Sequence, residues 1–341
     1  MDLGGIGQPL SLLCNPLISH LSLYDIVNTP GIAVDLSHIS TSSQVVGYLP
    51  SDNGLEKALT GSDIVIIAAG IPRKPLMSLE MLKYQDLFAT NSKIVYDLAK
   101  VIAKCSPDAF ILIISNPVNS IVPIITQVLK DCNVLNPRKL FGVTTLDIVR
   151  LSKFITEYVS ENVEPGHYTI PVVGGHSGMT IIPLISQSDP KVELSEEQLR
   201  SLIHKVQYAG DEVVKAKDRN GSATLSMAYS AFILIDAILK IGFLIFYRSL
   251  LILVYAKTGV SGIVQCSFVY LPGISGGNEI MEKINNLSFF SVPLVLGKDG
   301  IEKVHSFDFV FEIEKQLLKT ALPEIRKDID KGLSFYTEYS K

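Results

Sequence analysis

The sequence predicts an α/β protein with a doubly wound parallel sheet in its first half, and three observations carry this prediction. Apolar runs rich in Ile and Val alternate with segments of helical periodicity. A glycine-rich turn near the start of the chain is followed by a helical segment and a strand. Hydrophobic residues make up 47% of the 341 residues and charged residues only 19%, so the chain can bury a large core.

Two apolar runs are typical of buried parallel strands. Residues 63–69 read DIVIIAA and residues 109–115 read AFILIIS. Both runs are continuous rather than alternating, as expected for strands whose two faces are covered by helices. We expect the covering helices over residues 30–39, 87–103 and 120–130.

The order of elements changes beyond about residue 144. We expect a helix over residues 147–158, short strands near 168–173, and further helices over 195–217, from about 222, and over 307–339. This second half is of the α+β type, so we divide the chain into two domains at residues 1–143 and 144–341.

A turn rich in glycine stands at the start of the chain, at Gly4, Gly5, Ile6 and Gly7. Its backbone N–H groups suit a pyrophosphate at the start of the following helix, which we expect over residues 9–17. Asp25 follows Gly7 by about 18 residues, at the end of a strand expected over 20–26, where a carboxylate accepts hydrogen bonds from ribose hydroxyls. The alternative is an ordinary turn and a surface aspartate.

A glycine turn of this kind normally follows a buried strand, but only Met1, Asp2 and Leu3 precede Gly4. We therefore expect the first strand of the sheet to be missing from this chain. In the strand order 3-2-1-4-5-6 that strand is central, so its two neighbours are expected to have unpaired edges.

Charge and cysteine content limit the kinds of partner. The 30 basic and 34 acidic residues give a net charge of −4, which argues against a nucleic acid partner. No targeting segment is visible in the sequence. The cysteines lack metal-ligand spacing, so we expect no metal site, and free thiols that behave as small buried hydrophobic residues, at Cys14, Cys105, Cys132 and Cys266.

Three side chains in the second half form the pattern most informative about chemistry: Asp147, Arg150 and His176. Taking hydride from a 2-hydroxy acid also requires a proton acceptor, and an imidazole can act as one near neutral pH. A carboxylate bonded to the other ring nitrogen fixes the tautomer, and a guanidinium matches a substrate carboxylate with two parallel hydrogen bonds. The alternative is a solvated ion pair of Asp147 with Arg150 and a structural histidine.

Several motifs together resemble those of one enzyme family. GGIGQPLSLL, AAGIPRKP, SNPVNS, NPRKLFGVTTLDIVR, PVVGGHSG and GSATLSMAY are similar to segments of NAD-dependent malate dehydrogenases of the mitochondrial and bacterial type. The resemblance covers most of residues 4–237 and resumes near Gly262. It implies a Rossmann-type dinucleotide-binding domain, a catalytic α+β domain, NAD as cofactor, and oxidation of malate to oxaloacetate in the tricarboxylic acid cycle. It also implies a homodimer in the mitochondrial matrix, with the cytoplasm as the alternative location and no role for a membrane.

The resemblance assigns roles to individual residues. It implies that His176 is the proton acceptor, that Asp147 is its partner, and that Arg150 and Arg73 hold the two carboxylates of the substrate. Asn116 follows an expected strand at its carboxyl end and is expected to contact both substrate and cofactor. The other NAD contacts that it implies are Gly4, Gly5, Ile6, Gly7, Asp25, Asn91, Ser115 and Met227, the last of which has ordinary helix core as its alternative reading.

Two segments depart from the family pattern. The family carries a further arginine in a mobile loop shortly after Arg73, whereas here no arginine lies between Arg73 and Arg138, so Lys83 would have to substitute. A catalytically impaired NAD-binding homologue, or an incomplete gene model, is therefore the alternative function. Residues from 241 to about 257 form an apolar segment that contains Arg248, which we interpret as translated non-coding sequence. The alternatives are a membrane span and an extra core helix.

Overall fold

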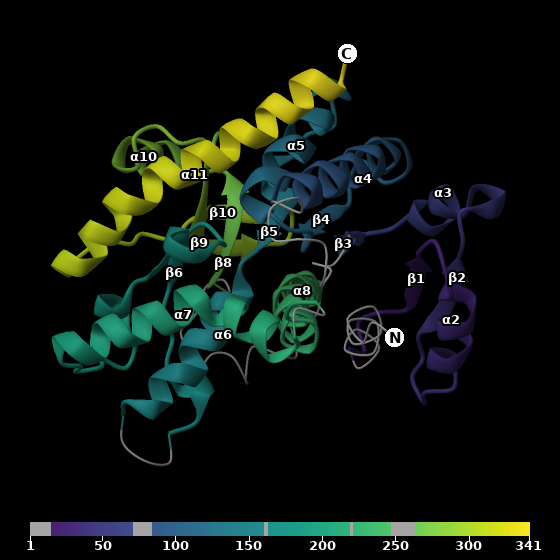
Figure 1. Ribbon diagram of the computed structural model, residues 1–341. Helices are drawn as coiled ribbons and strands as arrows, with labels where there is room; N and C mark the ends of the chain where they lie inside the picture. The colour runs from purple at the N-terminus through teal and green to yellow at the C-terminus, as the bar shows by residue number, and fades with distance from the viewer. Residues whose placement is uncertain (1–14, 71–83, 160–162, 219–220, 247–263) are drawn as a thin grey trace.

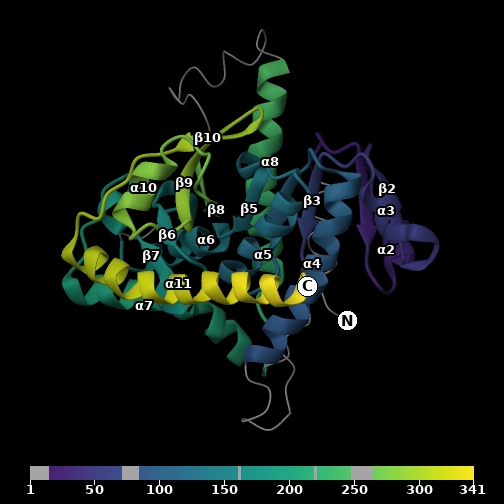
Figure 2. The ribbon, with the colours of Figure 1, turned by 90° about the horizontal axis from the view of Figure 1, so that it is seen from above.

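A computed structural model describes residues 15–70, 84–159, 163–218, 221–246 and 264–341, and the fold is α/β as predicted (Figure 1). An eight-stranded sheet runs through the molecule with helices on both faces, and a two-stranded sheet lies apart at one edge. The C-terminal helix α11 (Glu312–Tyr339) packs along α5 (Val118–Asp131) and crosses one face of the large sheet (Figure 2).

The parallel part of the large sheet agrees with the prediction. Strands β3 (Ile64–Ile67) and β4 (Phe110–Ile113) lie within the two apolar runs and pair in parallel, and β5 (Leu140–Val143) continues the sheet beside β4. Helices α4 (Tyr84–Cys105) and α5 lie close to their predicted ranges. Leu112 is fully buried, because helices cover both faces of β4.

The small sheet consists of β1 (His20–Tyr24) and β2 (Gln44–Tyr48), which pair in parallel and pack against α2 (Thr29–Ser37) and α3 (Gly54–Leu59). Strand β1 and helix α2 were predicted, whereas β2 and α3 were not. Strand β2 is short and contains Gly47, which weakens its strand pattern. A Cβ atom at that glycine would lie 2.2 Å from the carbonyl oxygen at the start of α2, so the close contact of strand and helix requires glycine.

The two strands on either side of the expected gap have few partners. Among the described residues β1 pairs only with β2, and β3 pairs with β4 on one side only. Residues 1–14 lie outside the described residues, so the expectation of unpaired edges stays a prediction. The glycine turn and most of the helix expected over 9–17 fall outside the described residues, and residues 15–17 form a turn instead of the predicted end of that helix.

Antiparallel strands that the sequence analysis missed complete the large sheet. Strand β8 (Val264–Tyr270) pairs with β5 and with β9 (Phe289–Gly297), which forms a hairpin with β10 (Gly300–Val304). All nine residues of β9 are buried. The sequence does not resemble a strand there, because Pro293 lies inside the run and proline is rare in the interior of strands. The short strands β6 (Val172–Gly174) and β7 (Ile181–Pro183) follow beyond β9, and only β6 overlaps the predicted strand region.

The predicted helices of the second half agree with the structure except at some ends, whereas α10 (Gly277–Lys283) was not predicted. Helix α7 (Glu196–Ala216) starts after Ser195, which forms a capping box with Gln198. Helix α11 starts at Glu312 rather than near 307, because the N–H groups that precede it donate to the buried Glu314 carboxylate. The other helices are α6 (Thr145–Phe154), α8 (Leu225–Phe246) and α10 (Gly277–Lys283), with 3-10 turns at Ser51–Asn53, Pro137–Lys139, Ile155–Glu157, Pro165–His167, Gly178–Thr180 and Ile185–Gln187.

The two anomalous segments fall mostly outside the described residues. The loop after Arg73, with Lys83, lies in residues 71–83, and most of the apolar segment lies in residues 247–263. The first part of the apolar segment continues α8 through Phe246, and Ile241 is buried there. Across the ranges that the structure describes, every helix is too short or too polar to cross a bilayer.

Three of the cysteines lie in described ranges, and all three are free thiols. Cys266 is buried in β8 as expected, and its burial raises the pKa of the thiol to about 12. Cys132 is exposed, so the prediction of a buried hydrophobic residue is wrong there. It forms the C-cap of α5, where the helix end reaches solvent.

Candidate active site

A cavity of about 2140 Å³ lies between β1 and β3, passes the carboxyl ends of β3 and β4 and extends to α6 and α8. Ligands bind at this end of the strands in open α/β sheets. The structure brings to its wall every predicted site residue in the described ranges, namely Asp25, Asn91, Ser115, Asn116, Asp147, Arg150, His176 and Met227. The other predicted site residues, Gly4, Gly5, Ile6, Gly7 and Arg73, lie outside the described residues.

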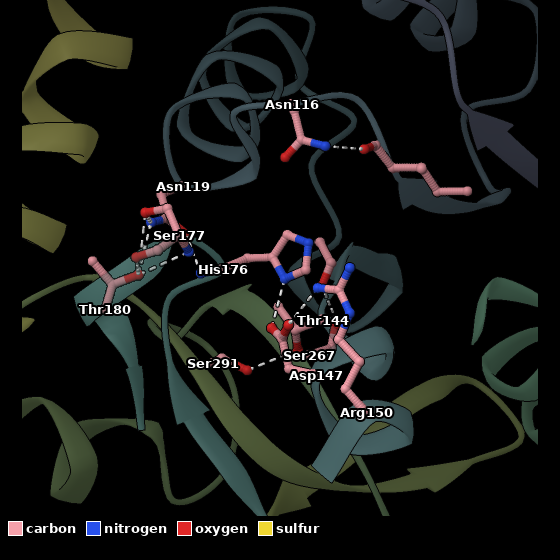
Figure 3. Close-up of polar contacts among 12 residues, drawn as sticks. Asn116, Asn119, Thr144, Asp147, Arg150, His176, Ser177, Thr180, Ser267 and Ser291 are labelled. Atoms are coloured by element: carbon pink, nitrogen blue, oxygen red, sulfur yellow. Dashed lines mark hydrogen bonds and ion pairs between the residues drawn. The ribbon is translucent and has the colours of Figure 1, made fainter. Parts of the chain in front are cut away.

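A short polar contact at the wall of the cavity joins His176 and Asp147 (Figure 3). Nδ1 of His176 lies 2.6 Å from Oδ2 of Asp147, and the aspartate side chain is fully buried. A carboxylate can only accept, so Nδ1 carries the hydrogen and Nε2 keeps a lone pair as a proton acceptor. Asp147 lies in the first turn of α6, where the helix dipole favours a negative charge.

Arg150 stands one turn further along α6, beside the same carboxylate. Its Nη1 lies 3.8 Å from Oδ1 of Asp147, too far for a hydrogen bond but close enough for an ion pair. Burial lowers the pKa of the guanidinium, and the charges of Asp147 and Glu212 oppose that shift. A solvated surface pair is thereby excluded, because the side chain of Asp147 has no exposed area and that of Arg150 has 13%.

The loop that carries His176 is shaped by contacts that the sequence analysis missed. Gly174 has a φ of 102°, and a Cβ atom there would lie 2.2 Å from the carbonyl oxygen of Thr180. The N–H of His176 donates to Oδ1 of Asn119, at 2.9 Å. Asn119 is 1% exposed in the first turn of α5, and a buried amide needs hydrogen-bond partners. Its place in the SNPVNS motif, near the expected site residue Asn116, was the signal that could have revealed it.

Asn116 lies at a turn held from two sides. Nδ2 of Asn91 donates to its carbonyl oxygen at 2.9 Å, and the hydroxyl of Ser115 donates to the carbonyl oxygen of Ala69 at 2.6 Å. The peptide bond from Asn116 to Pro117 is cis. The side chain of Asn116 is exposed at the cavity, whereas Asn91 and Ser115 are buried. The structure therefore gives Asn91 and Ser115 a part in shaping the turn.

The cavity is larger than the range of about 300–1,000 Å³ that is usual for small-molecule pockets, because it includes the space between β1 and β3, whose residues all line it. Asp25, at the end of β1, is exposed and accepts from the N–H of Ile26, so its carboxylate is open to solvent. Met227 is 8% exposed and packs in the main core cluster, as its alternative reading expected, and it also lines the cavity, so its contact with NAD stays a prediction.

Within the part of the chain that the structure covers, His, Cys, Asp and Glu side chains form no group of three that could hold a metal ion.

Comparisons with known proteins agree with this architecture. The lactate/malate dehydrogenase NAD binding domain matches residues 2–142, and the lactate/malate dehydrogenase alpha/beta C-terminal domain matches residues 144–336. The mitochondrial malate dehydrogenase of Schizosaccharomyces pombe is 47% identical and that of Sus scrofa 46% identical, each over 97% of this chain and 89% of the relative. The malate dehydrogenase of Picrophilus torridus in its apo form has a TM-score of 0.77, with 22% identity over 99% of this chain and 97% of that one, and shows the fold alone.

The sheet order, the His–Asp pair and these matches define a two-domain nucleotide-dependent dehydrogenase. The chain belongs to the lactate/malate dehydrogenase family, and NAD is its cofactor.

Proposed function

We propose that the protein oxidises malate to oxaloacetate with NAD, and reduces oxaloacetate in the reverse direction. The observation that carries the proposal is the buried 2.6 Å contact between His176 and Asp147 at the wall of the cavity. The relatives that match nearly the whole chain are named malate dehydrogenases, which supports malate as the substrate.

His176 and Asp147 act as the proton relay in this proposal. Nε2 of His176 takes the proton of the malate hydroxyl, and the buried carboxylate of Asp147 stabilises the imidazolium that forms. NAD, when bound, accepts the hydride from the substrate. In the reverse direction His176 starts protonated and returns the proton to the new hydroxyl.

Two arginines hold the substrate in this proposal. The guanidinium of Arg150 pairs with the carboxylate beside the reacting carbon, at the wall of the same cavity as His176. Arg73 holds the second carboxylate and thereby favours a dicarboxylate, because a desolvated arginine left unpaired by a monocarboxylate is costly. Asn116 contacts both substrate and cofactor.

The cofactor contacts are proposed on the sequence motif and on the lining of the cavity. Asp25 accepts hydrogen bonds from the adenosine ribose, and Asn91, Ser115 and Met227 line the cavity in the described ranges. The pyrophosphate contacts are Gly4, Gly5, Ile6 and Gly7. The proposed domain boundary remains at residues 143 and 144.

The proposal includes a homodimer and a mitochondrial location. The family resemblance supports a homodimer, and exposed Leu225 and Tyr229, one turn apart on α8, offer apolar surface for a subunit contact. The relatives are named mitochondrial malate dehydrogenases, which supports a mitochondrial location, proposed to be the matrix, with the cytoplasm as the alternative. Sedimentation of the purified chain and cell fractionation test the two points.

Oxaloacetate-dependent oxidation of NADH tests the proposed function. The wild-type chain is expected to turn over, and His176→Asn is expected to lose nearly all activity while it still binds NADH by fluorescence. His305→Asn, at an exposed histidine, is the matched control. Undiminished turnover in the His176→Asn protein would exclude that histidine as the proton acceptor, and pyruvate reduced faster than oxaloacetate would exclude the dicarboxylate substrate.

A further inference from the structure

The buried amide of Asn119 lies at the start of α5 and takes no direct part in the proposed proton transfer. Its Oδ1 accepts from the backbone N–H of His176 at 2.9 Å (Figure 3). Its Nδ2 donates to Oδ2 of Asp328 at 2.9 Å and lies 3.2 Å from the hydroxyl of Ser177. Asn119 therefore links the loop of the catalytic histidine to the C-terminal helix α11.

The partners of Asn119 fix the direction of its amide. A backbone N–H can only donate, so it requires the carbonyl oxygen of the side chain. An ionised carboxylate can only accept, so Asp328 requires the amino group. If the amide of Asn119 were flipped, its NH2 group would face the N–H of His176 and its carbonyl oxygen would face the carboxylate of Asp328. Both contacts would then be repulsive. Asp328 thus helps to decide which end of Asn119 faces His176.

Asp328 itself is held firmly against α5. The hydroxyl of Ser120 donates to the carbonyl oxygen of Asp328 at 2.7 Å. A Cβ atom at Gly332, one turn later, would lie 2.2 Å from the carbonyl oxygen of Ser120, so the two helix backbones touch there. The carboxylate is therefore presented to Asn119 by a rigid contact between α5 and α11.

The loop on the other side of Asn119 is equally close. A Cβ atom at Gly175 would lie 2.7 Å from Nδ2 of Asn119, so the amide packs directly on the backbone that leads into His176. The histidine is then held twice, at its ring by Asp147 and at its backbone by Asn119. These two contacts come from different helices, α6 and α5.

We propose that Asp328 is a positioning residue for the proton acceptor, acting through Asn119 on the backbone of His176. This inference rests on the proposed function, in which Nε2 of His176 must meet the substrate hydroxyl. A displacement of about 1 Å at a reacting group costs up to about 100-fold in rate. Burial raises the pKa of Asp328, as expected for a carboxylate kept in place despite the cost of removing it from water.

Two substitutions at Asp328 separate positioning from mere packing. Asp328→Leu keeps the size of the side chain but removes the acceptor, and kcat is expected to fall about tenfold or more while KM for oxaloacetate stays within about twofold. Asp328→Asn keeps an acceptor oxygen and is expected to retain kcat within about threefold. Asp330→Leu, at an exposed aspartate of the same helix, is the matched control and is expected to be unchanged.

A structural role alone would lower the melting temperature and leave kcat per folded molecule intact. A folded Asp328→Leu protein with wild-type kcat would therefore overturn the proposal, and so would equal losses in the Leu and Asn variants. Should Asp328→Leu not fold, Asp328→Ser takes its place, because its hydroxyl is one bond shorter than the carboxylate and cannot reach the amide.

Amide hydrogen exchange at His176 supplies a readout that does not depend on turnover. The N–H is expected to exchange slowly in the wild type and in Asp328→Asn, and at least about tenfold faster in Asp328→Leu. If the wild-type chain shows no turnover, the proposed function fails, and the exchange rates still decide whether Asp328 holds the loop. Equal exchange in all three proteins would overturn the positioning role.

Discussion

The two sheets of this protein differ in how firmly they are built into the molecule. Every residue of β5 and β9 in the large sheet is buried, whereas β1 and β2 of the small sheet are at most half-buried. The large sheet is surrounded by the main hydrophobic cluster, and the small sheet contributes to it only partly buried residues such as Leu21. The hydrophobic packing is therefore concentrated on the large sheet, which supports the proposed catalytic residues.

The same contrast holds for the site residues. Asp147 and Asn119 are buried and bonded to the loop of His176, so their geometry is set by the core. Asp25, on the cofactor side, is exposed at the end of β1 and bonds to the N–H of its own neighbour, Ile26. If the proposed roles hold, we expect rate and cofactor affinity to depend on regions that differ in burial, so that substitutions separate them.

The largest expected effect is on the catalytic side. Asp147→Asn preserves the size of the side chain but stabilises the wrong tautomer of His176, so kcat is expected to fall about 10⁴-fold. The affinity for NADH is expected to change little, because Asp147 acts on the histidine. Stopped-flow kinetics and NADH fluorescence measure the two quantities, and a loss of less than about tenfold in kcat would remove Asp147 from the relay.

Substitutions in the large sheet should lower the free energy of unfolding more than substitutions in the small sheet. Leu294→Ala removes a fully buried side chain from β9 and is expected to cost about 2–5 kcal/mol of unfolding free energy. Leu21→Ala, at a half-buried residue of β1, is expected to cost less than half as much. Urea unfolding followed by circular dichroism compares the pair. Equal losses would mean that the small sheet is as tightly packed as the large one.

The sequence predicted the parallel strands β3 and β4 of the large sheet but not its antiparallel strand β9. Continuous apolar runs revealed β3 and β4, because burial on both faces leaves no room for polar residues. The antiparallel strand β9 was missed because Pro293 contradicts a strand pattern, although the residue is buried there.

Site residues could be predicted from the sequence where the residue type itself indicated a chemical role. His176, Asp147 and Arg150 were identified from residue type and motif, and the structure places them together. Asn119 and Asp328 were not, because their contact joins residues 209 positions apart and only packing of α5 on α11 brings them together.

A smaller effect is expected on the cofactor side. Asp25→Asn removes the charge that accepts the ribose hydroxyls, so KM for NAD is expected to rise about tenfold with kcat nearly unchanged. Asp52→Asn, at another exposed aspartate of the first half, is the control. A fall in kcat without a change in KM would contradict the separation of the two regions.

The smallest expected effect concerns the pH dependence of stability, which the half-buried Asp328 on α11 influences. Burial raises the pKa of Asp328, and Glu324 adds to the shift, while the hydrogen bond from Asn119 and the charges of Lys327 and Lys331 oppose it. The native state then holds the proton more tightly than the unfolded state does, so the free energy of unfolding falls as pH rises from the ordinary carboxyl range, about 3.9, to the raised value.

Asp328→Asn does not titrate and lacks this loss. Its melting temperature relative to the wild type should therefore rise as pH increases from about 4 and level off once Asp328 is ionised. Because the residue is half-buried, solvent screening limits the gain to less than about 1 kcal/mol. Asp330→Asn should show no such trend, and a difference that shrinks with rising pH would mean that the carboxylate stabilises the fold. A carboxylate that costs stability yet sits against Asn119 is better explained by its effect on His176 than by packing.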